Sequence, residues 1–181
     1  MSYDLRAVIA AGEALRVATR GLAAARTTSI GQGLALLPMT DALCESLADG
    51  DRGGALGLPR LPGGFEKILA DWSTGGPVAY VAAEYFDGVG EQGAAVWDGG
   101  GVVLGPLRME EGEPFAPAGS PVSQALRRLG VVRSAGQDEF SVVGLDRHRH
   151  TEAWCAGHSP GHAAGWSKQP VWGARDIICA I

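Results

Sequence analysis

The stretch PVAYVAAEYFDGVGEQGAAVWDGGGVVLGP, from Pro77 to Pro106, decides the fold because it holds three strand-like segments joined by two glycine-rich turns. Residues 78–85 are rich in β-branched and aromatic side chains, which is typical of a strand buried on at least one face. Residues 94–97 and 102–104 give two further strands, separated by an Asp-Gly hairpin turn at residues 98–101. The stretch predicts a β-meander over residues 78–104 and an α+β fold with a mixed or mostly antiparallel sheet.

The first turn carries Gly88, Gly90 and Gly93, which match the dinucleotide-binding pattern G-x-G-x-x-G. In a dinucleotide site these glycines open a helix whose N-terminal amides hold the pyrophosphate. Here only residues 94–97 separate the pattern from the next turn, which is too short for a helix. We therefore expect the chain to reverse direction across residues 86–93, between antiparallel strands.

The remaining elements are predicted from periodicity and from residues typical of helix ends. We expect strands at residues 5–10 and 34–37, and helices at residues 12–22, after Thr40, at residues 65–72 and after Ser120-Pro121. Short apolar runs at residues 131–132 and 140–143 favour two more strands. We expect the helices to cover one face of the sheet. Residues 1–150 are predicted to form a single α+β domain, and residues 151–181 a C-terminal tail that is irregular or wraps the surface.

Composition limits the classes of partner. The chain has 181 residues, a net charge of −5 and a hydrophobic fraction of 46%. An acidic chain with two lysines does not fit nucleic-acid binding, which relies on clustered Lys and Arg. The longest apolar run is far shorter than a membrane span, so we expect no membrane contact. Three widely spaced cysteines give no disulfide framework and favour the reducing cytoplasm. The oligomeric state is left open.

A cluster of metal-ligating residue types lies near the end of the chain. It contains His148, His150, Cys155, His158 and His162. We expect no cofactor. The alternative is a bound zinc ion, because imidazole and thiolate are the ligands that zinc prefers. The spacing fits no common zinc finger, and arginines flank His148 and His150, which opposes a cation.

A second group of candidate residues surrounds the first turn of the meander. We expect a binding surface that includes Glu84, Asp87, Glu91 and Gln92, together with the acidic residues 110–113. The carboxylates also allow an alternative, in which two of them act as general acid and general base. No G-x-S-x-G, P-loop, H-E-x-x-H or C-x-x-C motif is present, so catalysis is not the favoured interpretation.

The segment YVAAEYFDGVGEQGAAVW, at residues 80–97, resembles a strand–loop–strand signature of uncharacterised actinobacterial cytosolic proteins. The segments YDLRAVIA, QGLALLPMTDAL and GLDRHRHTEAW are similar to the same family, so the resemblance covers residues 3–154. Asp87 stands where the family pattern has glycine. Some members look like immunity proteins of bacterial toxin systems, and the resemblance brings no catalytic residue with it.

The sequence therefore favours a non-catalytic binding or immunity-type protein that acts through protein–protein contact. An acidic surface of this kind complements a basic protein, such as a nuclease toxin, encoded nearby. The alternative is a small metal-binding protein or a hydrolase-like enzyme that uses the histidine and cysteine cluster or the loop carboxylates.

Overall fold

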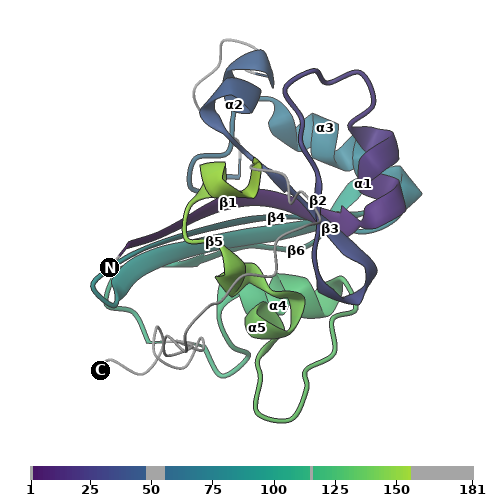
Figure 1. Ribbon diagram of the computed structural model, residues 1–181. Helices are drawn as coiled ribbons and strands as arrows, with labels where there is room; N and C mark the ends of the chain where they lie inside the picture. Colours follow the sequence, from purple (N-terminus) through teal and green to yellow (C-terminus); the bar gives the residue numbers. More distant parts are fainter. Residues whose placement is uncertain (1, 48–55, 115, 156–181) are drawn as a thin grey trace, which may run out of the picture.

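A computed structural model describes residues 2–47, 56–114 and 116–155, and these residues form a six-stranded antiparallel sheet with helices on both faces (Figure 1). The strands are β1 (Ser2–Ala11), β2 (Thr28–Ser29), β3 (Leu34–Pro38), β4 (Val78–Phe86), β5 (Val89–Asp98) and β6 (Gly101–Met109), in the order β2-β3-β1-β4-β5-β6. The helices are α1 (Gly12–Ala18), α2 (Asp41–Leu47), α3 (Phe65–Trp72), α4 (Pro121–Arg128) and α5 (Glu139–Val143). Short 3₁₀ turns lie at Gly31–Gly33, Ser73–Gly75, Leu145–Arg147 and Thr151–Cys155. The α+β class and the antiparallel sheet are as expected.

The meander is confirmed, and its two turns are tight. Asp87 and Gly88 have φ angles of 49° and 85°, and Gly99 and Gly100 have 59° and 86°. Positive φ at both central residues is what a two-residue type I′ hairpin turn requires. The first turn is thus shorter than the expected reversal over residues 86–93, because β5 already begins at Val89.

Gly90 and Gly93 lie inside β5, where they serve packing. A Cβ on Gly90 would lie 2.7 Å from the Tyr85 Cα on the paired strand, and one on Gly93 would lie 2.5 Å from Cδ of Pro59. Glycine at these positions lets another part of the chain approach the strand closely. No dinucleotide-type helix follows the glycines, because the chain continues as β5.

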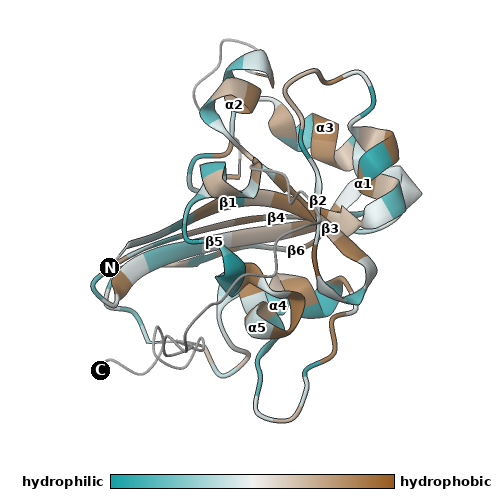
Figure 2. Cartoon of the chain, in the orientation of Figure 1, coloured by the Kyte–Doolittle hydropathy of each residue, from teal (hydrophilic) through white to brown (hydrophobic). Residues whose placement is uncertain are grey.

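Helices cover both faces of the sheet, so the expectation of one covered face is wrong. Helices α1, α2 and α3 lie over one face, and α4 and α5 lie over the other (Figure 1). Each face has its own hydrophobic core, one with Val8, Tyr80 and Trp97 at its centre and the other with Val81 and Val96. The continuous apolar run in β4 has this cause, since neighbouring residues of a strand point to opposite faces. The hydrophobic middle of the sheet contrasts with more hydrophilic strand segments on the way to the β4–β5 turn (Figure 2).

Helices α3 and α4 form where they are expected. Helix α3 buries Phe65 and Leu69. Helix α4 begins after Ser120, whose side chain accepts a hydrogen bond from the Ser123 backbone N–H at 3.2 Å, with Pro121 as the first helical residue. Serine as N-cap and proline at the first position are the preferred start of a helix.

The two short strands expected after α4 do not form. Residues 140–143 belong to helix α5, and residues 131–132 are in no regular element. Asp138 starts α5 by accepting a hydrogen bond from the Ser141 N–H at 2.9 Å, and Gly144 ends it with a φ of 78°. These local end signals outweigh the strand preference of the β-branched residues between them.

The chain returns to β1 just after residue 150. The backbone N–H of Arg6 donates to Thr151 Oγ1 at 2.9 Å, and Trp154, 1% exposed, packs into the core under α4 and α5. The remainder of the expected tail, residues 156–181, lies outside the described residues. Among the described residues no helix is both long enough and apolar enough to cross a membrane.

Candidate functional site

Three carboxylates line up across the end of the sheet next to the β4–β5 turn. Asp4 on β1 is paired with Glu84 on β4, and Glu84 is paired with Glu91 on β5. Directly opposite residues on antiparallel strands share a face, so these three side chains lie in one row, here called the acidic row. The row lies on the face that α1–α3 cover further along, but the strands extend beyond these helices at this end (Figure 1).

An arginine from a separate loop neutralises part of the acidic row. Arg60 Nη2 lies 2.5 Å from Glu84 Oε2, and its Nη1 lies 3.5 Å from Asp4 Oδ1. Within the part of the chain that the structure describes, Glu91 makes no ion pair. Like charges directly opposite one another destabilise a sheet, so the Glu84–Glu91 pair carries a cost, which the ion pair of Glu84 with Arg60 partly offsets.

The turn beyond the acidic row exposes apolar side chains. Phe86 is 69% exposed and Val89 is 45% exposed, and the two are paired across the hairpin. Each lies two residues from an acid of the row, Phe86 from Glu84 and Val89 from Glu91, and residues two apart on a strand share a face. Asp87 is exposed in the turn between them. We call Asp4, Glu84, Phe86, Val89 and Glu91 together the hairpin face.

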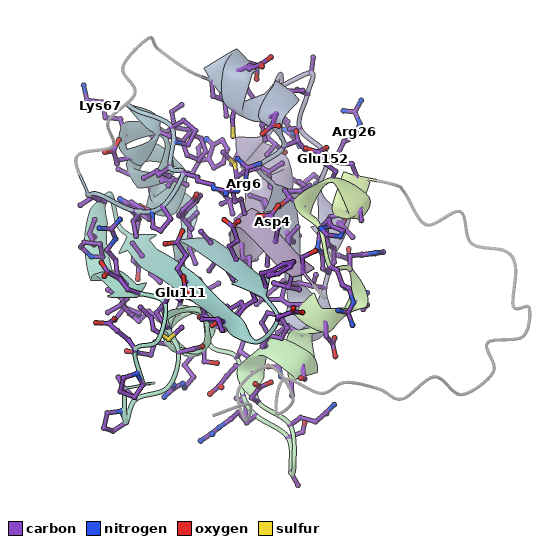
Figure 3. All side chains as sticks on the ribbon, turned by 90° about the vertical axis from the view of Figure 1, so that its left-hand side faces the viewer. Asp4, Arg6, Arg26, Lys67, Glu111 and Glu152 are labelled. Atoms are coloured by element: carbon purple, nitrogen blue, oxygen red, sulfur yellow. The ribbon has the colours of Figure 1, made fainter. Side chains whose placement is uncertain are left out.

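A groove continues the negative charge toward the end of β6. It has a volume of about 270 Å³ and is lined by Pro59, Glu91, Gln92, Arg108, Met109, Glu110 and Glu111. The structure thus brings Glu91 beside two acids of the expected 110–113 stretch. Figure 3 looks onto this end of the sheet, with Asp4 near the middle of the view and Glu111 below it to one side.

The Gln92 side chain has a structural place. It is 9% exposed, and its Nε2 donates to Tyr85 Oη at 2.8 Å while its Oε1 accepts from the Val122 N–H at 3.2 Å. Both partners belong to the core under α4, on the sheet face opposite Glu84 and Glu91. Gln92 therefore ties β5 to the start of α4. Of the four expected binding residues, the structure places Glu84 and Glu91 side by side, Asp87 at the turn and the Gln92 side chain behind them.

Two of the four histidines, His148 and His150, lie among the described residues. His148 packs edge-on against Trp154, with 4.7 Å between ring centroids, and Arg147 lies 5.4 Å above the same ring. His150 forms an isolated bridge with Asp4. His158 and His162 lie outside the described residues. Among the residues that are described, no three His, Cys, Asp or Glu side chains are grouped to hold a metal ion.

The cysteines of the described chain are free thiols. Cys44 and Cys155 are both partly buried and form no disulfide. Burial raises the pKa of each thiol, and at Cys44 the nearby Arg6 guanidinium offsets part of the effect. A raised pKa keeps a thiol protonated and a poor nucleophile. Neither cysteine is thus prepared for nucleophilic catalysis.

Sequence reasoning missed three residues of the site, Asp4, Arg60 and Phe86. Asp4 alternates with buried residues at the start of β1, which signals an outward position but not which strand lies beside it. Arg60 lies in an irregular loop with no periodicity.

The opposition of Glu84 and Glu91 also fits the hydrolase-like alternative, since an acid–base pair needs two neighbouring carboxyl groups.

Comparison with family models, with curated proteins and with solved structures finds no significant match to this chain. The resemblance to actinobacterial immunity-type proteins therefore stays a prediction.

Proposed function

We propose that this chain is a non-catalytic, cytoplasmic binding protein whose hairpin face docks onto a basic surface of a partner protein. The observation that carries the proposal is an exposed aromatic residue, Phe86, at the edge of a row of carboxylates. Exposed aromatic residues are typical anchors of protein interfaces, and surrounding charges select the partner and speed association.

The charge of the site favours a partner rich in arginine and lysine. Arg6 and Arg60 line the same hollow as Asp4, Glu84 and Glu91, and Arg60 pairs with the first two of these acids. Glu110 and Glu111 extend the surface along the groove beside Arg108, so acids outnumber arginines across it. The net charge of −5 adds a long-range attraction to basic proteins. Together with the family resemblance, this supports an immunity-type role, in which the acidic surface covers the basic active site of a toxin. The free thiols Cys44 and Cys155 fit a reducing compartment.

The test uses the products of the neighbouring genes, each expressed and purified separately. Titration calorimetry should find one basic protein among them that binds the wild-type chain, with an affinity that falls as salt is added. The double variant Glu84→Lys/Glu91→Lys should weaken this binding at least about tenfold, because it places cations against a basic partner.

Glu13→Lys is the matched control, since Glu13 is an exposed acid on α1 that already pairs with Arg16. It repeats one charge reversal away from the hairpin face and should leave most of the affinity intact. If none of the neighbouring products binds, the immunity-type role is contradicted. If one binds and the double variant binds it as tightly as Glu13→Lys does, the hairpin face is not the binding surface.

A further inference from the structure

We infer that Arg60 is an internal competitor on the hairpin face: it occupies the position that an arginine of the partner takes in the complex, and the partner must displace it. This inference rests on the proposed function and adds to it the side chain that is recognised and a contact that limits affinity. It follows from how Arg60 is held, how it meets the acids and what surrounds it.

The loop that carries Arg60 is fixed to the sheet on both sides of this residue. Leu58 and Leu61 are buried in the core under α1–α3, and the Pro59 carbonyl accepts a hydrogen bond from Tyr80 Oη at 2.8 Å. Arg60 itself has a φ of 54°, a conformation that is uncommon for a residue other than glycine. The anchored loop thus presents one long cationic side chain to the acidic row.

The contact has the form of a guanidinium divided between two carboxylates. One terminal nitrogen of Arg60 meets Glu84 on β4 and the other meets Asp4 on β1. A planar guanidinium has donors on separate arms and can bridge two acids in this way, whereas the compact ammonium of lysine acts as a point charge. Asp4 and Glu84 are therefore spaced for arginine, and Phe86 on the same face offers a ring on which a guanidinium can stack.

The contact is also open to exchange. The side chains of Arg60, Asp4 and Glu84 are 46%, 31% and 49% exposed, so water and a competing cation reach them. Ion pairs at this level of exposure are weak. Glu91, next in the row, makes no ion pair within the described residues and offers a first contact for an incoming arginine. An arginine of the partner can then replace Arg60 between Asp4 and Glu84 without any movement of the sheet.

The experiment measures binding of a hexa-arginine peptide and a hexa-lysine peptide to the full chain at low salt. Arg60→Ala should bind hexa-arginine about two- to fivefold more tightly than wild type, the range that corresponds to the loss of one exposed ion pair. The gain for hexa-lysine should be smaller, because an ammonium cannot bridge Asp4 and Glu84. Arg16→Ala is the control, since it removes the same charge from an exposed pair with Glu13 on α1.

Arg60→Gln is the second variant, which keeps most of the side-chain length and guards against loosening of the loop. The inference is overturned if both Arg60 variants bind hexa-arginine no more tightly than Arg16→Ala does. This failure is distinct from failure of the proposed function. In the first case Glu84→Gln and Glu91→Gln still weaken peptide binding while Arg60 has no effect. In the second case the glutamine variants leave peptide binding unchanged as well.

Discussion

Among single residues, Gly90 on β5 leaves no room for a side chain. An added Cβ would lie 2.7 Å from the Tyr85 Cα and would collide with the Glu84 carbonyl oxygen, both on the backbone of the paired strand. That backbone cannot move aside without disturbing the ladder. We expect Gly90→Ala to lower the free energy of unfolding by about 1–3 kcal/mol, the usual cost of overpacking. Urea unfolding followed by circular dichroism measures it.

Gly101 gives the matched control for Gly90, because it also lies in a meander strand but a Cβ there meets no atom within 4 Å. Gly101→Ala should change the free energy of unfolding by no more than about 0.5 kcal/mol. Equal losses in the two variants would mean that the close approach at Gly90 is not what requires glycine.

The same scale shows what the sequence could reveal of the candidate site. Glu84 and Glu91 could be predicted as binding residues, because they lie on either side of a turn that is recognisable from its glycines. Asp4 and Arg60 could not, since their place beside Glu84 depends on strand pairing and on a loop conformation that no local pattern encodes. The inward direction of the Gln92 side chain could not be predicted, because the expected turn extends to Gly93 and leaves Gln92 outside any strand, whereas Gln92 lies within β5.

At the scale of elements, the start of α4 depends on one side chain. Ser120 is 8% exposed, and its hydroxyl accepts from the Ser123 N–H at 3.2 Å. Ser120→Ala leaves that amide without a partner in a position that water barely reaches. We expect a loss of about 1 kcal/mol in the free energy of unfolding, within the range measured for N-caps. Thermal or urea unfolding gives the value, and Ser120→Asp should retain most of the stability because aspartate is an equally good cap. A Ser120→Asp variant as unstable as Ser120→Ala would contradict the capping role.

Elements with strong local signals could be predicted, and elements without them could not. Helix α4 has a cap, a proline and a periodic apolar face, and it was predicted at its observed position. Helix α5 has five residues, too few for a helical period, so the β-branched pair Val142-Val143 suggested a strand. Asp138 and Gly144 were the available signals at its two ends, and they act through backbone hydrogen bonds rather than through side-chain pattern.

For the molecule as a whole, the strand order could not be predicted from the sequence. The meander accounts for β4, β5 and β6 as neighbours, but β1 lies between β3 and β4 and places residues 2–11 in the middle of the sheet. This arrangement arises from long-range burial, since two cores need a central strand that is apolar on both faces. Helices cover both faces of the sheet for the same reason, because a strand that is apolar on both faces needs a core on each side. The local sequence pattern indicates that β4 is buried, but it does not show which helices cover each face of the sheet.

The ionisation of the three tyrosines of the chain depends on the burial of β1 and β4 in the middle of the sheet. Tyr3, Tyr80 and Tyr85 all lie buried in β1 and β4. Burial raises the pKa of each phenol above its ordinary value of about 10. The charges of Asp146 and Asp4 raise the pKa of Tyr3 further, and the hydrogen bond from Gln92 offsets part of the rise at Tyr85.

The raised pKa values predict how stability depends on alkaline pH. Above pH about 10 the unfolded chain loses its phenolic protons while the folded chain keeps them, so the unfolded state binds fewer protons. The contribution of the tyrosines to stability is therefore fully present below pH about 10 and falls as the pH rises further. Near-ultraviolet absorbance should show no tyrosinate in the folded protein at the pH where all three tyrosines ionise in urea. Tyrosinate should then appear together with the loss of far-ultraviolet circular dichroism. Ionisation of any tyrosine near pH 10 with the sheet signal intact would mean that this residue is not sealed within the two cores.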